Sequence, residues 1–202
     1  PPMTRLQLRT EMQLRTEAGC GLAIGRWPRF RYNASGGGGV AVPDRPDAPG
    51  SPGPDQHDWQ PLRFDPAGLR IPPLNCGTTR FLGLPLPPGL SITITPQRLE
   101  GRWQPACGAV DLGFEARFRF AIAGLYTAPD LRVVTRLSTA SAQGRRHHAS
   151  GTPLDGAGRG VLVGIARVEP CGEPWLDRFL GLPDEALAIL RCRISAPTEG
   201  EG

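Results

Sequence analysis

The densest group of side chains able to do chemistry is a run of two arginines and two histidines, Arg145, Arg146, His147 and His148. Guanidinium groups bind anions and imidazoles bind anions or metal ions, so the run is a candidate anion site or, in an enzyme, a catalytic loop. Adjacent residues of a strand point to opposite faces, which disfavours one metal ion shared by both histidines. Glycines flank the run, so we interpret it foremost as an exposed loop tip.

Two carboxylates, Asp111 and Glu115, share one face of a predicted strand, as paired catalytic acids would. Arg117 and Arg119 share that face, and this pattern favours a surface ladder of opposite charges instead. No serine stands in a Gly-x-Ser-x-Gly elbow, and the five cysteines show neither metal-ligand spacing nor an identifiable histidine partner. We therefore predict no catalytic residue, no metal site and no cofactor.

An aromatic row is the second candidate for function. Residues 109–122 alternate between apolar and polar, which predicts a half-buried strand with Phe114, Phe118 and Phe120 on its inner face. A curved sheet with such a face can enclose an apolar ligand, and Trp103 on the preceding predicted strand would add to the lining. The same residues would serve an ordinary packed core, which is the more frequent outcome, so both interpretations stay open.

A proline-rich stretch, residues 84–90, is the third candidate. Its prolines exclude a helix and favour an extended loop, in which Leu84, Leu86 and Leu90 could present an apolar surface. Such a loop would contact a protein partner or the surface of a membrane.

The elements that must position these candidates are mostly strands. Period-two alternation or β-rich composition marks residues 4–18, 90–95, 98–103, 109–122, 131–139 and 161–168, the last apolar on both faces. Two short C-terminal helices are predicted, one from Pro174 to Leu180 that stops at Gly181, and one that opens at Pro183-Asp184-Glu185. The expected fold is mainly β, a curved antiparallel sheet or barrel closed by the two helices.

Length and composition limit the number of domains, the partners and the cellular location that we expect. With 202 residues, a single domain is expected, interrupted by a disordered Pro- and Asp-rich insertion at 43–61 and ending in a flexible tail at 195–202. All 23 basic residues are arginine and they are scattered, so the net charge of +4 disfavours nucleic acid as a partner. The apolar runs are too short to span a membrane, and the N-terminus lacks the pattern of a signal peptide. We therefore expect a cytoplasmic chain, in which the odd number of cysteines would be reduced thiols.

The block from Leu90 to Leu190, through LPLPPGLSITITPQRLEGRW, GAVDLGFEARFRF, LVGIARVEP and RFLGLPDEALAIL, resembles an uncharacterised family of β-rich cyanobacterial proteins of similar length. This resemblance implies a cytoplasmic setting or a peripheral position at the thylakoid membrane, and it brings no activity. In architecture alone, the expected fold also resembles lipocalin-like barrels, which handle pigments or lipids.

These observations rank three functions. The first is a non-catalytic β domain that binds an apolar small molecule, lipid or pigment. The second is an interaction or assembly factor that uses residues 84–90 and the C-terminal helices against a protein. The third is an enzyme of unknown class.

Overall fold

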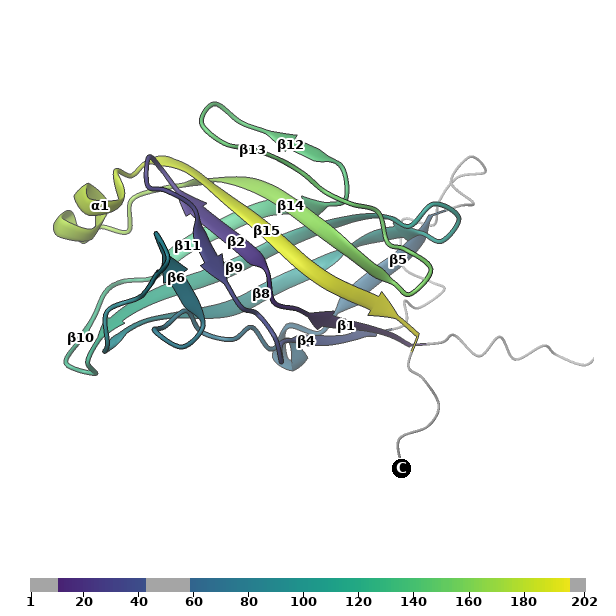
Figure 1. Ribbon diagram of the computed structural model, residues 1–202, viewed down its shortest axis with the longest axis horizontal. Helices are drawn as coiled ribbons and strands as arrows, with labels where there is room; N and C mark the ends of the chain where they lie inside the picture. The colour runs from purple at the N-terminus through teal and green to yellow at the C-terminus, as the bar shows by residue number, and fades with distance from the viewer. Residues whose placement is uncertain (1–10, 43–58, 197–202) are drawn as a thin grey trace, which may run out of the picture.

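The computed structural model describes residues 11–42 and 59–196, and the chain there is built almost entirely of antiparallel strands (Figure 1). The strands are β1 (Met12–Thr16), β2 (Cys20–Ile24), β3 (Phe30–Tyr32), β4 (Gly38–Val42), β5 (Gln60–Phe64), β6 (Thr79–Phe81), β7 (Leu84–Pro85), β8 (Leu90–Gln104), β9 (Ala109–Ile122), β10 (Tyr126–Thr127), β11 (Leu131–Ser138), β12 (Ser141–Gln143), β13 (His148–Ser150), β14 (Arg159–Val168) and β15 (Asp184–Ser195). A short 3₁₀ turn, η1 (Pro66–Gly68), and one helix, α1 (Pro174–Leu180), complete the list.

Eight of the strands close a ring in the order β1-β4-β5-β8-β9-β11-β14-β15, with β15 returning to β1. The ring is not a regular barrel, because β15 pairs with β1 over one half of its length and with β2 over the other. From β2 the sheet continues through β3, β6 and β7, so this branch lies beside α1 and β10 at one end of the molecule (Figure 1). We call this end the α1 end. The mainly β prediction is confirmed.

The predicted strand 109–122 is confirmed as β9, the long strand that pairs with β8 and β11. Its even-numbered residues face the core, where Val110, Leu112 and Ala116 are at most 1% exposed. Strand β14 is also as predicted: Leu162 and Val163 point to opposite faces, and both are buried. The hairpin of β12 and β13 lies beside β14 on the outside of the ring (Figure 1).

The second C-terminal helix was predicted wrongly. Residues 184–195, which include the helix-favouring run Glu185-Ala186-Leu187-Ala188 near their start, form strand β15 instead. Their helix preference is worth only a few tenths of a kcal/mol per residue. As a strand, the segment forms a ten-residue ladder with β14 on one edge and pairs with β2 and β1 on the other. It also buries Leu187, Cys192 and Ile194. These tertiary interactions outweigh local preference.

The first C-terminal helix is confirmed. Pro174 occupies its first turn, and Gly181 ends it in the left-handed conformation with φ of 71°. Leu176 and Leu180 are buried against the sheet. In the described part of the chain, no helix has the length and apolar character that a membrane crossing requires.

The core consists of three clusters of buried side chains along the inside of the ring. One surrounds Leu112 and Phe64, the second Tyr32 and Ile94, and the third joins Leu131 to the buried face of α1. Most of the predicted insertion 43–61 and of the predicted tail 195–202 lies outside the described residues, although β5 begins at Gln60 and β15 ends at Ser195.

Candidate functional site

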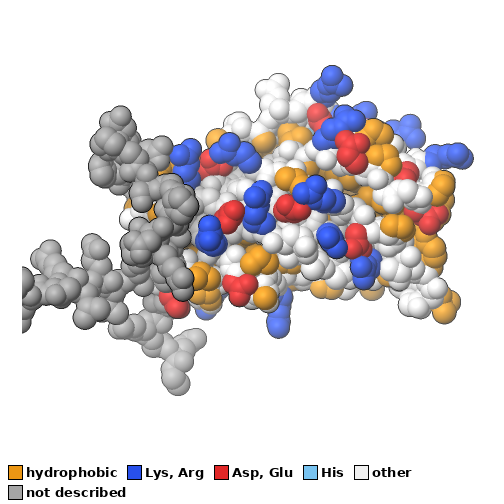
Figure 2. Space-filling view, turned by 180° about the vertical axis from the view of Figure 1, so that it is seen from behind, with side chains coloured by type: hydrophobic (Ala, Val, Ile, Leu, Met, Phe, Trp, Pro, Cys, Tyr) orange, Lys and Arg blue, Asp and Glu red, His pale blue; other side chains and the backbone are white. Residues whose placement is uncertain are grey.

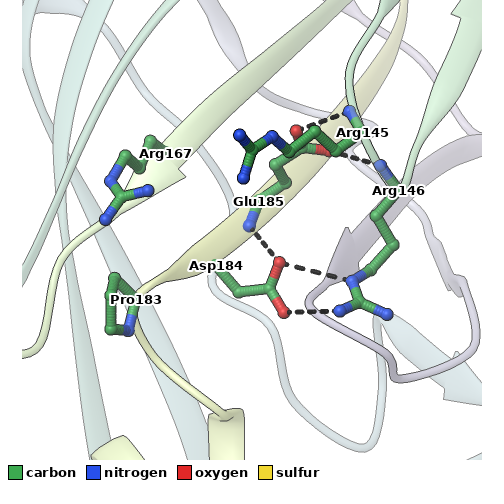
Figure 3. A pocket seen from close by; sticks show the side chains of 6 residues that line it. All are labelled: Arg145, Arg146, Arg167, Pro183, Asp184 and Glu185. Carbon is green, nitrogen blue, oxygen red and sulfur yellow. Dashed lines mark hydrogen bonds and ion pairs between the residues drawn. The ribbon is translucent and has the colours of Figure 1, made fainter.

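The Arg145–His148 run lies where β12 turns into β13, at the hairpin that covers the outer face of the ring. Three successive backbone N–H groups there point at one carboxylate. Those of Arg145 and Arg146 donate to Glu185 at 2.7 and 2.9 Å, and that of His147 donates at 3.4 Å (Figure 3). These donors lower the pKa of Glu185 below its ordinary value of 4.5. The loop therefore does hold an anion, and the anion is the protein's own side chain.

A hollow of about 560 Å³ opens beside this loop, lined by Arg145, Arg146, Arg167, Pro183, Asp184 and Glu185. Two of its arginines already have acidic partners. Arg146 contacts Asp184 at 3.2 Å (Figure 3), and Arg167 contacts Glu169 at 2.6 Å. Burial raises the pKa of Asp184, but the N–H of Glu185 and the Arg146 guanidinium outweigh it and the pKa is lowered. The cluster thus fastens the hairpin to the start of β15, and its carboxylates occupy the positions that an external anion would take.

The two histidines of the run separate as expected for neighbours on a strand. His148 is exposed on β13, whereas His147 is half-buried and its Nε2 has no hydrogen-bond partner among the described residues. Within residues 11–42 and 59–196, no three His, Cys, Asp or Glu side chains are grouped as ligands of a metal ion.

The predicted charge ladder follows the outer face of β8, β9 and β11 (Figure 2). Asp111 lies between Arg102 and Arg136, and Glu115 accepts from Arg132 at 2.8 Å. The Arg132 guanidinium lowers the pKa of Glu115. The two carboxylates are therefore held apart by separate arginines, and they do not form a catalytic pair. A second hollow, of about 380 Å³, lies over Gly101 and Gly113 on the same outer face.

The aromatic row lies on the inner face of β9, as predicted, but it is not uniformly buried. Leu112 and Ala116 are 0% exposed, Phe118 and Phe120 are half-buried, and Ile122 on the same face is 44% exposed. The side chains of the facing strand β8 show the same increase in exposure, since Ile94 is buried while Ile92 and Leu90 are half-buried. The apolar inner face thus becomes more exposed toward the α1 end.

The other two predicted ligand-binding residues are also half-buried, but they lie further from the α1 end. Phe114 packs against both the Leu112 and the Ile94 clusters. Trp103 lies opposite Val110, at the far end of the same pair of strands, and packs against the Leu112 cluster. The structure therefore places Phe118 and Phe120 together near the exposed end and separates Trp103 from them.

The three leucines of the predicted contact loop have different environments. Leu84 is 70% exposed, Leu86 is buried at 7%, and Leu90 is half-buried against the core. Leu86 is not on the surface, because the chain turns inward there and its N–H donates to the carbonyl of Thr79. The exposed part of this region is instead a hairpin, β6–β7, whose tip residue Leu82 is 71% exposed.

Sequence reasoning missed a line of aromatic side chains at the α1 end. Tyr126 lies 5.8 Å from Trp175, Phe179 lies 5.0 Å from Trp27, and Trp27 lies 6.3 Å from Phe81, all between ring centroids. We call these five residues the aromatic rim. Trp175 and Phe179 are one helical turn apart on α1 and connect its two halves. The only signal in the sequence was the i, i+4 spacing of that pair, since the other members come from distant segments.

No family model, no curated protein and no solved structure matches this chain.

Proposed function

We propose that the protein is a non-catalytic domain that binds an apolar small molecule or lipid at the α1 end, in contact with Phe118 and Phe120. The observation that carries this proposal is the graded exposure of the inner face of β8 and β9. Its apolar side chains are sealed around Leu112 and Ile94, and they remain partly exposed at Phe118, Phe120 and Leu90.

Partly exposed aromatic rings on an inward face favour the binding of an apolar molecule, because a bound molecule would remove their remaining apolar surface from water. Removing apolar surface from water is worth about 25 cal/mol per Å², and full burial of a phenylalanine is worth about 1.5–3 kcal/mol relative to exposure. A ligand that covers what is still exposed of Phe118 and Phe120 would gain part of that free energy. The aromatic rim borders the same end and would extend the contact, since Phe81 packs against the Tyr32 cluster and the ring of Trp27 lies 6.3 Å from that of Phe81.

The carboxylates of the outer face serve as ion-pair and hydrogen-bond partners within the fold. Glu115, Asp184 and Glu185 all have lowered pKa values, because arginines or backbone N–H groups hold them as anions. A carboxylate held ionised in this way is a poor general acid at neutral pH. Their hydrogen bonds instead stabilise the outer face of the ring.

Native mass spectrometry of the protein purified from its own host, without detergent, tests the proposal first. We expect a retained apolar molecule. A titration with cis-parinaric acid, a fluorescent fatty acid, supplies a defined probe. We expect Phe118→Ala to weaken its binding about tenfold, on the basis of the lost aromatic contact area.

Val134→Ala is the matched control, because Val134 is an exposed apolar residue of the outer face of β11 and its truncation leaves the inner face intact. Equal affinity of Phe118→Ala and the wild type, with circular dichroism showing both folded, would refute the assigned site. Absence of both a retained molecule and parinaric acid binding would refute the proposed function.

A further inference from the structure

Exposed apolar side chains gather at the α1 end. Leu82 and Leu84 at the β6–β7 hairpin are 71% and 70% exposed, Leu125 in the β9–β10 turn is 92% exposed, and Trp175 and Phe179 of α1 are 45% and 55% exposed. Leu84 lies opposite Phe81, so the hairpin adjoins the aromatic rim. Figure 2 shows apolar side chains along the edge of the molecule at this end, whereas charged side chains cover the middle of the visible face.

The tip of the β6–β7 hairpin has an unusual residue for its backbone. Leu82 has φ of 51° and Gly83 has φ of 80°, the left-handed pair of a two-residue turn. Gly is the ordinary occupant of such a position because it has no Cβ, and Asn follows because its short polar side chain can hydrogen-bond locally. Here the strained residue is a leucine with most of its surface in water. Neither local conformation nor packing against the other described residues accounts for leucine at this position.

Arginines flank the same segments. Arg26 and Arg29 border the β2–β3 turn, Arg31 lies on β3, Arg80 on β6 and Arg178 on α1, and all five are exposed. Among the described residues, none of these five has an acidic group within 4.0 Å, whereas ten other arginines do. Arg15, Arg70, Arg117, Arg145 and Arg191 also lack such a partner among the described residues, but they are spread over the rest of the fold, whereas the five at the α1 end are gathered on neighbouring segments.

The unneutralised positive charge of the α1 end is clearest at one pair of arginines on neighbouring strands. Arg31 and Arg80 lie directly opposite each other on the antiparallel pair β3–β6. Like charges in that position repel, and the cost is usually relieved by an acid nearby. Arg117 and Arg132 form a similar pair on β9 and β11, but Arg132 there contacts Glu115. For Arg31 and Arg80 the structure shows no such acid among residues 11–42 and 59–196.

We propose that the α1 end docks on an anionic lipid bilayer. Leu82, Leu84 and the aromatic rim would enter the interface, where tryptophan rings in particular are favoured. The arginines on the outer wall would then contact phosphates of the headgroups, and their long side chains can reach along the apolar edge to do so. Charge complementarity selects this occupant, because a neutral partner would leave the repulsion between Arg31 and Arg80 uncompensated. The inference shares the aromatic rim with the ligand site proposed for the inner face, but it does not require a ligand to be bound there.

Co-sedimentation with vesicles tests the docking surface. We expect the full chain to bind vesicles of phosphatidylcholine with phosphatidylglycerol, to bind pure phosphatidylcholine vesicles weakly, and to lose affinity as salt is raised. The double variant Arg31→Gln/Arg80→Gln should bind about thirtyfold more weakly, taking about 1 kcal/mol for each arginine near an anionic surface. The variant Arg117→Gln/Arg132→Gln is the matched control, because it removes an equal charge from a cross-strand arginine pair on the ring.

The apolar side chains of the docking surface are tested with a second variant and its control. Leu82→Ser/Leu84→Ser should weaken binding about tenfold, since the affinity of interfacial segments scales with the apolar area they bury. Val40→Ser/Val42→Ser is the control, because these two exposed valines lie on β4, away from α1 (Figure 1). Phe118→Ala should leave vesicle binding unchanged, which separates this proposal from that of the inner ligand. Thermal unfolding by circular dichroism verifies that each variant is folded.

Three results would overturn the proposal. One is an equal affinity for neutral and anionic vesicles. Another is an equal loss of affinity in the test variants and their controls. The third is that the protein binds no vesicles, while a partner protein co-purifies with the wild type and is lost when Leu84 is replaced. That result would make a protein the occupant of this end.

Discussion

The indole N–H of Trp27 donates to the backbone carbonyl of Phe179 at 2.9 Å, and the two rings stack at 5.0 Å between centroids. This contact joins the turn after β2 to helix α1, across 152 residues of sequence. It holds a seven-residue helix that is too short to be stable by itself. The stability of α1 therefore depends on a partner that a local segment cannot supply.

Trp27→Phe should loosen α1. The variant keeps a ring but loses the hydrogen bond, which is worth about 1 kcal/mol, so the amides of residues 174–180 should exchange with solvent about fivefold faster. Trp27→Ala should have a larger effect, because the stacking with Phe179 is lost as well. Hydrogen–deuterium exchange read by mass spectrometry measures both. Trp59→Phe is the control, since the Trp59 ring lies under the Arg102 guanidinium and away from α1; protection of α1 that is unchanged by Trp27→Ala would contradict this role.

Leu112→Ala should strongly destabilise the fold. Leu112, near the beginning of β9, is 0% exposed, and truncation of a buried leucine costs about 2–5 kcal/mol in free energy of unfolding because a cavity remains. Val134→Ala on the outer face should change the free energy of unfolding by less than about 0.5 kcal/mol. Urea unfolding monitored by circular dichroism measures the difference. Similar values for the two variants would mean that β9 does not carry the core.

The β12–β13 hairpin should detach from the ring at acid pH. The pKa of Glu185 is lowered in the folded protein, so the unfolded state binds more protons between the two pKa values. Its stabilising contribution is therefore complete above the ordinary pKa of 4.5 and disappears as pH falls through the lower, folded pKa. Hydrogen exchange of the amides of residues 144–147, corrected for the intrinsic pH dependence, should show the loss of protection. In Glu185→Gln these amides should be weakly protected already at pH 7, and persistent protection in that variant would exclude the clamp.

Four of the five cysteines should react with thiol reagents as two distinct groups. None of them forms a disulfide; Cys76 and Cys107 are exposed, and Cys20 and Cys192 are buried. Burial raises the pKa of the Cys20 thiol and raises that of Cys192 to about 12, so both lack thiolate as well as access at pH 8. We expect iodoacetamide to label Cys76 and Cys107 in the native protein, and Cys20 and Cys192 only after unfolding. Mass spectrometry of tryptic peptides identifies the sites, and rapid labelling of Cys192 would show that the ring opens.

Prediction from sequence succeeded where the pattern was long and local. The alternation of residues 109–122 specified the inner face of β9, and the proline and glycine at its ends specified α1. It failed at β15, where Ala, Leu and Glu favour a helix but the ladders to β14, β2 and β1 decide the structure. It also left Leu86 on the surface, because the apolar neighbours that bury it come from other segments.

The candidate sites also include features that could be predicted from local sequence and features that could not. Side-chain chemistry within a few residues of sequence was sufficient to suggest an exposed loop tip or anion site at Arg145–His148 and a charge ladder at Asp111 and Glu115. Only the tertiary structure showed that Glu185 fills that loop, that the apolar inner face is exposed at one end, and that Trp27, Phe81, Tyr126 and α1 meet there. The physical reason is that ion pairing, burial and ring contacts depend on distance in space. In this antiparallel ring that distance is set by strand pairing between segments far apart in the chain.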